Sequence, residues 1–260
     1  MANEEITFSV DAGVGILTLN RPHKLNAFNV AMVDRWSGIL EGAIDDPNIR
    51  VIIVTGAGRA FCAGGDATDM LDGLNAPPTE FKNFLWHHVH AVPRALDRLD
   101  KPVIAALNGT ARGAGLDMAL MCDLRIAAES AVFAESYINM GLIAGDGGTY
   151  FLPRLIGSAL ALELFWTGDE ISAREAERIG MVNRVVPDDQ VMKASMELAR
   201  KIAGQPQEAI RYYKRAVRSG TNTTLAAHLD MVSSHMAVLQ HTADHRDRVN
   251  AFLNRQRETK

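Results

Sequence analysis

The chain has 260 residues, an apolar fraction of 47% and a net charge of -4. This length fits one large domain, or one domain with a small appendage, and it is enough to bury a sizeable core. The balance of charges excludes the strongly basic footprint of a nucleic-acid-binding protein. No apolar run approaches the roughly 20 residues of a membrane-spanning helix, so we expect no membrane partner.

The compartment is predicted from the cysteines and the first residues. Cys62 and Cys122 both lie in apolar settings and cannot form a disulfide framework. We therefore expect buried free thiols in a reducing compartment. The acidic segment Met1–Glu5 lacks the apolar core of a signal peptide, which favours the cytoplasm.

The first third of the chain alternates strand patterns with a helix pattern. Ile6–Val10 and Val14–Leu19 predict a hairpin around Asp11-Ala12-Gly13. Asn29–Asp46 has apolar residues at helical spacing, with Asn29 as its N-cap. Further strands are predicted at Val51–Val54, Val103–Leu107, Leu124–Ala127 and Ala131–Phe133.

The middle of the chain predicts a loop and two helices. Asp69–Thr79 contains Gly73 and a Pro-Pro pair and is predicted to be irregular. Glu80–Leu99 is predicted to be a helix interrupted near Pro93, and Ala114–Met121 a second helix.

The second half is mostly helical by its pattern. Helices are predicted at Ala159–Trp166, Ser172–Ile179, Asp188–Ala203, Gln207–Ser219 and Thr224–Asn254. Together with the first half, this distribution predicts a mixed α/β body with a helical C-terminal part, and a boundary near Gly204-Gln205-Pro206. A mild basic cluster is predicted to be a solvated helix face rather than a binding patch; it consists of Arg211, Lys214, Arg215 and Arg218.

Two glycine-alanine segments carry the strongest functional signal. Arg59–Asp66 follows the first buried strand pattern, and Asn108–Asp117 follows the second. A strand, a small-residue turn and a helix start leave backbone N–H groups free and aimed at one point. Two such turns side by side predict a site that stabilises a developing oxyanion.

These segments, with three others in the same order, resemble the enoyl-CoA hydratase/isomerase family, also called the crotonase superfamily. The resemblance covers nearly the whole chain. The segments that carry it are Leu19-Asn20-Arg21-Pro22 with Leu25-Asn26-Ala27, Ala60–Asp66, Lys101–Gly109, Gly141–Gly157 and Ala173–Pro187.

The resemblance implies a spiral of ββα units followed by helices, assembled as trimers or dimers of trimers. It implies that residues 1–204 form the core with the acyl-CoA site and that residues 205–260 form a trimerisation region. The implied substrate is an acyl-CoA thioester, so coenzyme A enters as part of the substrate and no separate cofactor is expected.

The resemblance also assigns binding roles. The thioester carbonyl would lie between the backbone N–H groups of Gly65 and Ala114, where losing one donor typically costs about 3–4 kcal/mol of barrier. Lys24 would meet a phosphate, although an exposed lysine in a turn is an equal alternative. The other positions implied to contact coenzyme A are Leu25, Ala27, Ala63, Asp66, Ala67 and Phe252, the last of them together with Arg255 and sometimes from a neighbouring subunit.

The chain departs from the family where its hydratases carry two glutamates. The first glutamate position falls on Asp117, which keeps a carboxylate but loses one methylene of reach. The second falls on Tyr137, whose ordinary pKa of about 10 makes it a hydrogen-bond donor and a poor base. The two-glutamate mechanism therefore cannot be transferred unchanged.

Asp146 is the leading candidate for a second carboxylate, because its loop borders the reacting carbons in the family. The alternative is that Asp146 caps the helix that follows it, and both roles can hold together. Glu135 would share a face with Tyr137 in a strand, but we expect a surface or interface glutamate there.

The histidines His87, His88 and His90 do not predict a metal site, because no Cys or carboxylate follows at ligand spacing. By resemblance, this helix forms part of the acyl pocket, so His90 is either a pocket-lining residue or a helix-surface histidine.

These residues predict an acyl-CoA-processing enzyme in which hydration or double-bond isomerisation proceeds through an enolate. Asp117 and Asp146 would share the acid and base work, and Tyr137 would orient substrate or water. Thioester hydrolysis and C–C bond cleavage are enzymatic alternatives, and a non-catalytic acyl-CoA-binding protein is the alternative from another class.

Overall fold

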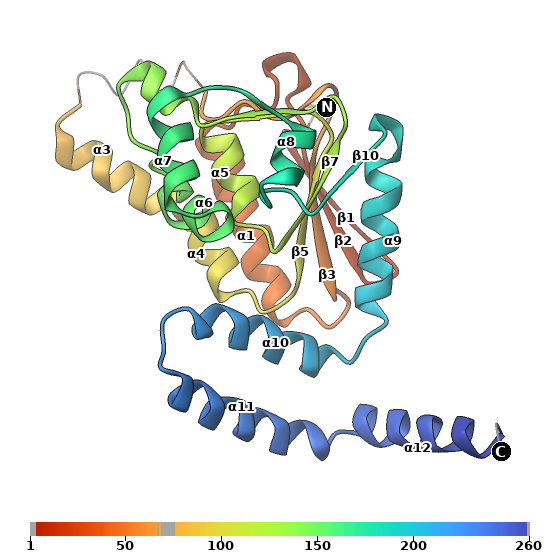
Figure 1. Ribbon diagram of the computed structural model, residues 1–260. Coiled ribbons are helices and arrows are strands. Elements are labelled where there is room, and N and C mark those ends of the chain that lie inside the picture. The colour runs from red at the N-terminus through yellow and green to blue at the C-terminus, as the bar shows by residue number, and fades with distance from the viewer. Residues whose placement is uncertain (1–3, 67, 69–75, 259–260) are drawn as a thin grey trace.

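The computed structural model describes residues 4–66, 68 and 76–258. A six-stranded sheet forms the centre of the body (Figure 1), with the strand order β1-β2-β3-β5-β7-β10. Its strands are β1 (Ile6–Asp11), β2 (Val14–Leu19), β3 (Val51–Gly56), β5 (Val103–Leu107), β7 (Leu124–Ala128) and β10 (Arg184–Val186). β1 and β2 pair antiparallel, which confirms the predicted hairpin, and every other pair is parallel.

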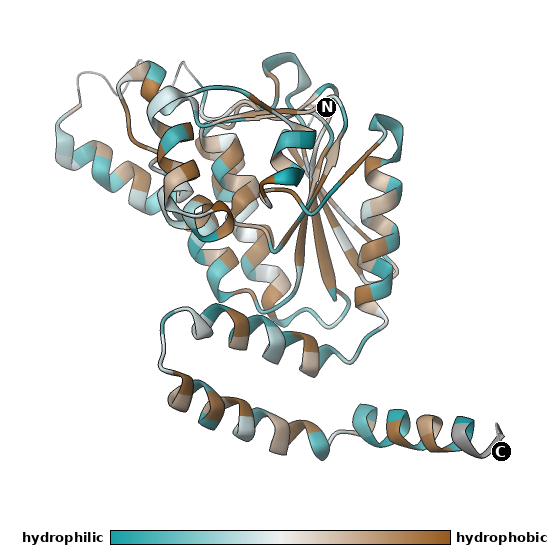
Figure 2. Cartoon of the chain, viewed as in Figure 1, coloured by the Kyte–Doolittle hydropathy of each residue, from teal (hydrophilic) through white to brown (hydrophobic). Residues whose placement is uncertain are grey.

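Helices cover both faces of this sheet, which explains why all six residues of β3 are buried. α9 (Val191–Ala203) lies against β2, β3, β5 and β7 on one face, while α1 (Val30–Asp45) and α4 (Ala91–Arg98) pack together on the other side. The strands form the continuous brown centre of Figure 2. Asn29 caps α1 as predicted, since its side chain accepts the Met32 N–H.

A second, four-stranded sheet lies at the carboxyl ends of the first. It contains β4 (Ala60–Cys62), β6 (Thr110–Arg112), β8 (Val132–Ala134) and β9 (Ile171–Ser172), in that order. The chain therefore runs repeatedly from a long strand of the first sheet to a short strand of the second and then to a helix, as in β5, β6 and α5 (Ala114–Leu120). This is the predicted spiral of ββα units.

The segment predicted as one helix over Glu80–Leu99 is three pieces. α3 (Pro78–Phe84) continues into a π-helical turn, η2 (Leu85–Val89), before α4 begins. An interruption was predicted near Pro93, and the structure places it at Leu85–His90, about one turn earlier. Pro93 is the third residue of α4, where a helix has no acceptor for its N–H, so the proline costs nothing. The predicted loop Asp69–Thr79 falls mostly outside the described residues.

The remaining elements follow the predicted order, with one correction. The segment Thr224–Asn254 is not one helix. α11 (Leu225–Gln240) ends with His241 as its C-cap, and α12 (Ala243–Glu258) begins two residues after that cap. The other elements are η1 (Pro22–Lys24), η3 (Ser136–Met140), α6 (Gly148–Ile156), α7 (Ser158–Thr167), α8 (Ala173–Arg178), η4 (Asp188–Gln190) and α10 (Gln207–Gly220).

The basic cluster of α10 is not the solvated face that was predicted. Lys214 and Arg218 form ion pairs with Asp123, and Arg215 pairs with Asp100. Lys214 also donates to the backbone carbonyl of Lys101. These contacts join α10 to the body. Among the residues whose burial is described, α11 and α12 have no buried residue, and both helices extend away from the sheet (Figure 1).

Two further observations concern thiols and membranes. Cys62 and Cys122 are free and buried as predicted, and burial raises the pKa of each thiol to about 12. Within the described residues, no helix combines the length and the apolar character that crossing a membrane requires.

Candidate active site

The two small-residue turns lie against each other because β4 pairs with β6, in the register Ala60 with Thr110 and Cys62 with Ala111. Gly64 has a φ of +104°, and a Cβ there would lie 3.2 Å from the Arg112 carbonyl oxygen. A Cβ on Gly115 would lie 2.2 Å from the carbonyl oxygen of Cys62. Glycine is therefore required where the turns meet, and a larger residue would separate them.

Gly65 and Ala114, one from each turn, line the same cavity of about 200 Å³. Among the described residues, neither of their N–H groups donates a hydrogen bond to another part of the chain. Ala114 is the first residue of α5, so its N–H is one of the donors that a helix start leaves free. Two unpaired donors at one cavity fit an oxyanion with one positive helix end behind it.

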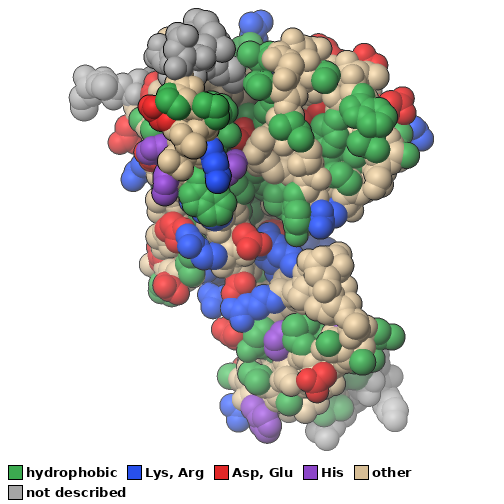
Figure 3. Space-filling model, turned by 90° about the vertical axis from the view of Figure 1, so that its left-hand side faces the viewer, with side chains coloured by type: hydrophobic (Ala, Val, Ile, Leu, Met, Phe, Trp, Pro, Cys, Tyr) green, Lys and Arg blue, Asp and Glu red, His purple; other side chains and the backbone are tan. Residues whose placement is uncertain are grey.

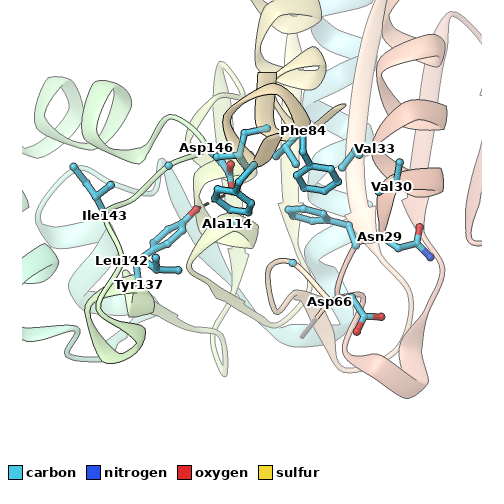
Figure 4. A pocket seen from close by; sticks show the side chains of 16 residues that line it. Asn29, Val30, Val33, Asp66, Phe84, Ala114, Tyr137, Leu142, Ile143 and Asp146 are labelled. Carbon is cyan, nitrogen blue, oxygen red and sulfur yellow. Dashed lines mark hydrogen bonds between the residues drawn. The ribbon is translucent and has the colours of Figure 1, made fainter. Parts of the chain in front are cut away.

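The wall opposite these donors is apolar (Figure 4). Asp146 and Tyr137 lie close to Ala114, and Phe84, Val33 and Val30 face them across the cavity. The full apolar lining comprises Phe28, Val30, Val33, Phe81, Phe84, Leu85, Val89, Leu142 and Ile143. A cavity with this lining suits a hydrocarbon acyl group and has few partners for a second charged group.

A charged cluster lies at the other end of the cavity. Asp66 accepts from Lys24 at 2.7 Å and from Arg21 at 3.0 Å, and Arg21 also pairs with Glu5. These partners, Lys24 first, hold the pKa of Asp66 far below its usual range, so this carboxylate stays ionised and is a poor base. Its backbone N–H is used as well, since it donates to the carbonyl of Phe28.

The loop of Leu25 and Ala27 is fixed to the first turn. Leu25 and Asn26 both have positive φ, at 52° and 59°, and the Leu25 carbonyl accepts from Ala63 N–H. Asn26 is fully buried. Its side-chain oxygen accepts a hydrogen bond from Arg21 N–H, and its side-chain NH2 donates to the carbonyls of Ala57 and Ala60. This role of Asn26 was not predicted, although its place in the segment Leu25-Asn26-Ala27 was a usable signal.

Asp117, Tyr137 and Asp146 lie together. The Tyr137 hydroxyl lies 2.8 Å from Asp117 Oδ2 and 3.0 Å from Asp146 Oδ2. Asp146 N–H also donates to Asp117 Oδ2, at 3.2 Å. Because both carboxylates contact one phenol oxygen, they lie close enough to act on one pair of adjacent carbons.

These carboxylates differ in their access to the cavity. Asp146 and Tyr137 line it, whereas Asp117 is fully buried behind Tyr137. Burial is the main cause that raises both carboxyl pKa values, to about 7 for Asp117. Burial and the two aspartates also raise the pKa of Tyr137, so the phenol remains protonated at neutral pH. Of the carboxylates that line the cavity among the described residues, Asp146 is thus the one suited to accept a proton.

Two expectations about this region are wrong. Asp146 does not cap α6, because the N-cap is Gly147, and the N–H of Gly148 at the start of the helix donates to Asp117. Glu135 is not a surface residue, since it is only 1% exposed. The strand argument for Glu135 also fails, because β8 ends at Ala134 and Tyr137 lies in a 3₁₀-helix. No local pattern identified Glu135 as buried, since a charged residue just after a strand usually faces solvent.

The histidines separate into two settings. His88 Nδ1 contacts the exposed Asp34, whereas His90 Nε2 lies 2.9 Å from the Gly145 carbonyl oxygen and 3.9 Å from Asp146 Oδ1. His90 thus supports the loop of Asp146 from beneath and is not among the residues that line the cavity. Within the described residues, no group of three or more His, Cys, Asp or Glu is arranged to hold a metal ion.

Phe252 lies on α12, is 58% exposed and is not among the residues that line the cavity of its own chain. Ala67 lies outside the described residues.

Comparison with known proteins agrees with this geometry. The model of the enoyl-CoA hydratase/isomerase family matches residues 9–259. The chain is 39% identical to the 1,2-epoxyphenylacetyl-CoA isomerase of Escherichia coli, over 96% of this chain and 95% of that protein. It is 34% identical to the crotonyl-CoA hydratase of Syntrophomonas wolfei, over 99% and 98% respectively.

Solved structures give the same result. The crystal structure of an enoyl-CoA hydratase from Bacillus anthracis superposes with a TM-score of 0.90, at 35% identity and with 97% of each chain covered. The fold, the cavity and the relatives together show that this chain is a member of the enoyl-CoA hydratase/isomerase family, whose enzymes are lyases or isomerases.

Proposed function

We propose that this enzyme isomerises the double bond of an enoyl-CoA thioester and that Asp146 carries the proton. A 3-enoyl-CoA is the simplest substrate of this class. The observation that carries the proposal is the asymmetry between the two aspartates: Asp146 lines the cavity, and Asp117 is enclosed behind Tyr137. Isomerisation needs one carboxylate that takes and returns a proton, whereas hydration by two carboxylates needs both to reach the reacting water.

The steps balance without a co-reactant. The thioester oxygen accepts hydrogen bonds from Gly65 N–H and Ala114 N–H. Ionised Asp146 then removes a proton from C2, and the electron pair moves onto the thioester oxygen to form a dienolate that these N–H groups stabilise. Asp146 returns the same proton to C4, which conjugates the double bond with the thioester and regenerates the carboxylate.

The charged end of the cavity suits coenzyme A. Lys24 is 40% exposed and paired with Asp66, so one of its three hydrogens is committed and the others can meet a phosphate. Leu25, Ala27 and Ala63 would provide backbone contacts to the adenine. We expect Lys24→Ala to raise KM for the acyl-CoA several-fold and to leave kcat nearly unchanged, because Lys24 lies away from Asp146.

The deciding experiment compares two reactions. Isomerisation of trans-3-hexenoyl-CoA is followed by the appearance of conjugated thioester absorbance, and hydration of crotonyl-CoA by its loss. We expect isomerisation to be the faster reaction and Asp146→Asn to reduce it by about 10²–10⁴-fold, the usual contribution of a general base. The matched control is Asp34→Asn, at an exposed aspartate whose side chain pairs with His88, outside the cavity.

Two outcomes would contradict the proposal. Crotonyl-CoA hydration faster than isomerisation would assign the enzyme as a hydratase, as the name of the Syntrophomonas wolfei relative states for that protein. Unchanged isomerisation in Asp146→Asn would remove Asp146 from the proton transfer. Binding of coenzyme A by the variant, measured by calorimetry, shows that the cavity is intact.

The proposal places the enzyme in the cytoplasm, with a role in fatty acid metabolism. It also includes a homo-oligomer, a trimer or a dimer of trimers. The support for the oligomer is the C-terminal region, where α10–α12 expose many large apolar side chains that a subunit interface would cover (Figure 3). Residues 205–260 would then form the trimerisation region, and Phe252 would reach a neighbouring subunit's site. Sedimentation equilibrium tests this, and a monomer at micromolar concentration would contradict it.

A further inference from the structure

Three buried carboxyl groups meet at one wall of the cavity, and the proposed reaction uses only one of them directly. Asp117, Glu135, Tyr137 and Asp146 are here called the carboxyl cluster. Asp117 comes from the first turn of α5, Glu135 follows β8, Tyr137 lies in η3 and Asp146 precedes α6. Asp117 is fully buried, Glu135 is 1% exposed and Asp146 is 6% exposed. A buried carboxylate is costly unless it is paired or hydrogen-bonded.

The cluster has almost no cationic partner. Within the described residues, the one basic group within ion-pair distance of it is His90, whose Nε2 lies 3.9 Å from Asp146 Oδ1. The other titratable neighbour is the Cys62 thiol, on which the charge of Asp146 acts. Three negative charges in this setting would repel one another without compensation, so the cluster must hold protons.

The contacts within the cluster determine how many protons it holds. The Tyr137 hydroxyl contacts one oxygen of Asp117 and one of Asp146, but it has a single hydrogen. One of those two aspartates must therefore supply the second hydrogen. Both oxygens of Glu135 have no donor among the described residues, whereas Asp117 also accepts from the backbone N–H groups of Asp146 and Gly148. Glu135 lies within hydrogen-bonding reach of Asp117. A hydrogen on Glu135 satisfies that contact.

We propose that Glu135 is a positioning residue: it stays a neutral carboxylic acid and donates to Asp117, so that hydrogen bonds run from Glu135 through Asp117 and Tyr137 to an ionised Asp146. This arrangement has two carboxylic acids, one carboxylate and one phenol. Each of the three oxygen-to-oxygen contacts then has one hydrogen. The role rests on Asp146 being the base of the proposed reaction.

The direction of these hydrogen bonds, from Glu135 toward Asp146, follows from the different exposure of the two aspartates. Asp146 borders the cavity and lies near His90, whereas Asp117 is enclosed, so the single negative charge is more stable on Asp146. Donors that point toward the charge strengthen one another along the chain. Asp146 is thus held as the carboxylate that the first proton transfer requires, without an arginine or lysine in contact with it.

The burial of Glu135 also favours its protonated form. Burial is the main cause that raises the pKa of Glu135 to about 10, and the charge of Asp146 acts in the same direction. The proposal can therefore be tested without any turnover, by infrared difference spectroscopy of wild type against Glu135→Gln at pH 7. We expect the wild type to show the C=O stretch of a protonated carboxylic acid that the variant lacks. Loss of carboxylate bands instead would overturn the proposal.

The pH profile of isomerisation gives a second test, with Glu135→Met as a similar-sized side chain that cannot donate. Without the first donor the charge on Asp146 is less stable, so the acidic limb of kcat should move to higher pH by about 0.5–1 unit. Glu135→Gln retains a donor and should restore the limb to within about 0.2 unit of wild type. If Glu135 were ionised, both variants would remove a negative charge and move the limb to lower pH.

Ser195→Ala is the matched control, because it removes another buried hydroxyl with no partner from α9, outside the cavity. Its pH profile should coincide with that of the wild type. If Glu135→Met does not fold, the sign of the shift in Glu135→Gln and the infrared spectrum still decide the question. If the protein does not isomerise 3-enoyl-CoA at all, the spectrum tests Glu135 separately from the proposed function.

Discussion

The two sides of the cavity stabilise charge in different ways. On one side Gly65 and Ala114 offer backbone N–H groups, held by the pairing of β4 with β6 and by close glycine contacts. On the other side, the carboxyl cluster depends on side-chain hydrogens whose number can change with pH. The first side is fixed by backbone geometry, and the second by proton count. Substitutions on the two sides should therefore have different signatures: loss of rate at every pH on the first, displacement of the pH profile on the second.

Apart from Asp146→Asn, the largest effect in this comparison is expected from Ala114→Pro. Proline is well tolerated at the first position of a helix, and it removes the N–H of that residue. Losing one oxyanion donor should reduce kcat by about 10²–10³-fold. The acidic limb of the profile should not move, because no charge in the carboxyl cluster changes.

The control for this variant is Ser158→Pro, at the exposed first position of α7, which follows a glycine of positive φ as Ala114 does. It introduces the same ring at an equivalent helix position and should retain the activity of the wild type. A pH-dependent loss in Ala114→Pro would show that the two sides are not independent.

Much of the backbone side could be predicted from the sequence, because its signals are local. A buried strand followed by small residues predicts a turn with free N–H groups, and β4–β6 pairing needs only that two such turns follow neighbouring parallel strands. The hairpin of β1 and β2, the cap at Asn29 and the order of the helices are local in the same sense.

The side-chain cluster could not be predicted equally well, because its members come from four separate elements. Tyr137 and Asp146 were identified by position, but their shared hydrogen bonds depend on how η3 packs over the start of α5. Glu135 was expected at the surface, since nothing in its neighbours along the chain shows that Asp117 lies against it. The break at Leu85–Val89 was misplaced because a π-helical turn has no strong residue preference.

Tyr137→Phe tests the other side. The Tyr137 hydroxyl lowers the pKa of both aspartates, and its loss should raise the pKa of Asp146. The acidic limb of kcat should then move to higher pH, and at pH values well below the limb the rate should fall by about tenfold for each unit by which the pKa rises. At high pH the rate should recover toward that of the wild type. Tyr150→Phe is the control, since Tyr150 is half-exposed on α6. A loss that persists at every pH would mean that Tyr137 acts on the substrate itself.

Asp117→Asn is expected to have a smaller effect than a two-carboxylate mechanism requires. Asparagine can accept from Glu135 through its carbonyl and donate to Tyr137 through its amide, so the order of donors is kept, but the Asp146 N–H loses its acceptor. We expect kcat to fall by less than about tenfold, against about 10²–10⁴-fold for a lost general base. Asp117→Leu cannot accept or donate and should lose more than the asparagine variant. Equal, complete loss in both would make Asp117 a proton-transfer residue.

The smallest expected effect concerns stability, and it separates the two sides without substrate. The pKa of Glu135 is raised from 4.5 to about 10 in the folded protein, so folding binds this proton more tightly than the unfolded chain does. Its contribution is complete below about pH 4.5 and is lost as the pH rises toward 10. Between pH 7 and 9 the free energy of unfolding should therefore fall by up to about 1.4 kcal/mol per pH unit from this group alone. Glu135→Gln has no proton to lose, so its Tm should fall less steeply with pH than that of the wild type. The two slopes should differ by about 3–5 °C per pH unit. Ala114→Pro, which alters the backbone side, should keep the slope of Tm against pH of the wild type. Equal slopes in the wild type and Glu135→Gln would show that Glu135 is already ionised at pH 7.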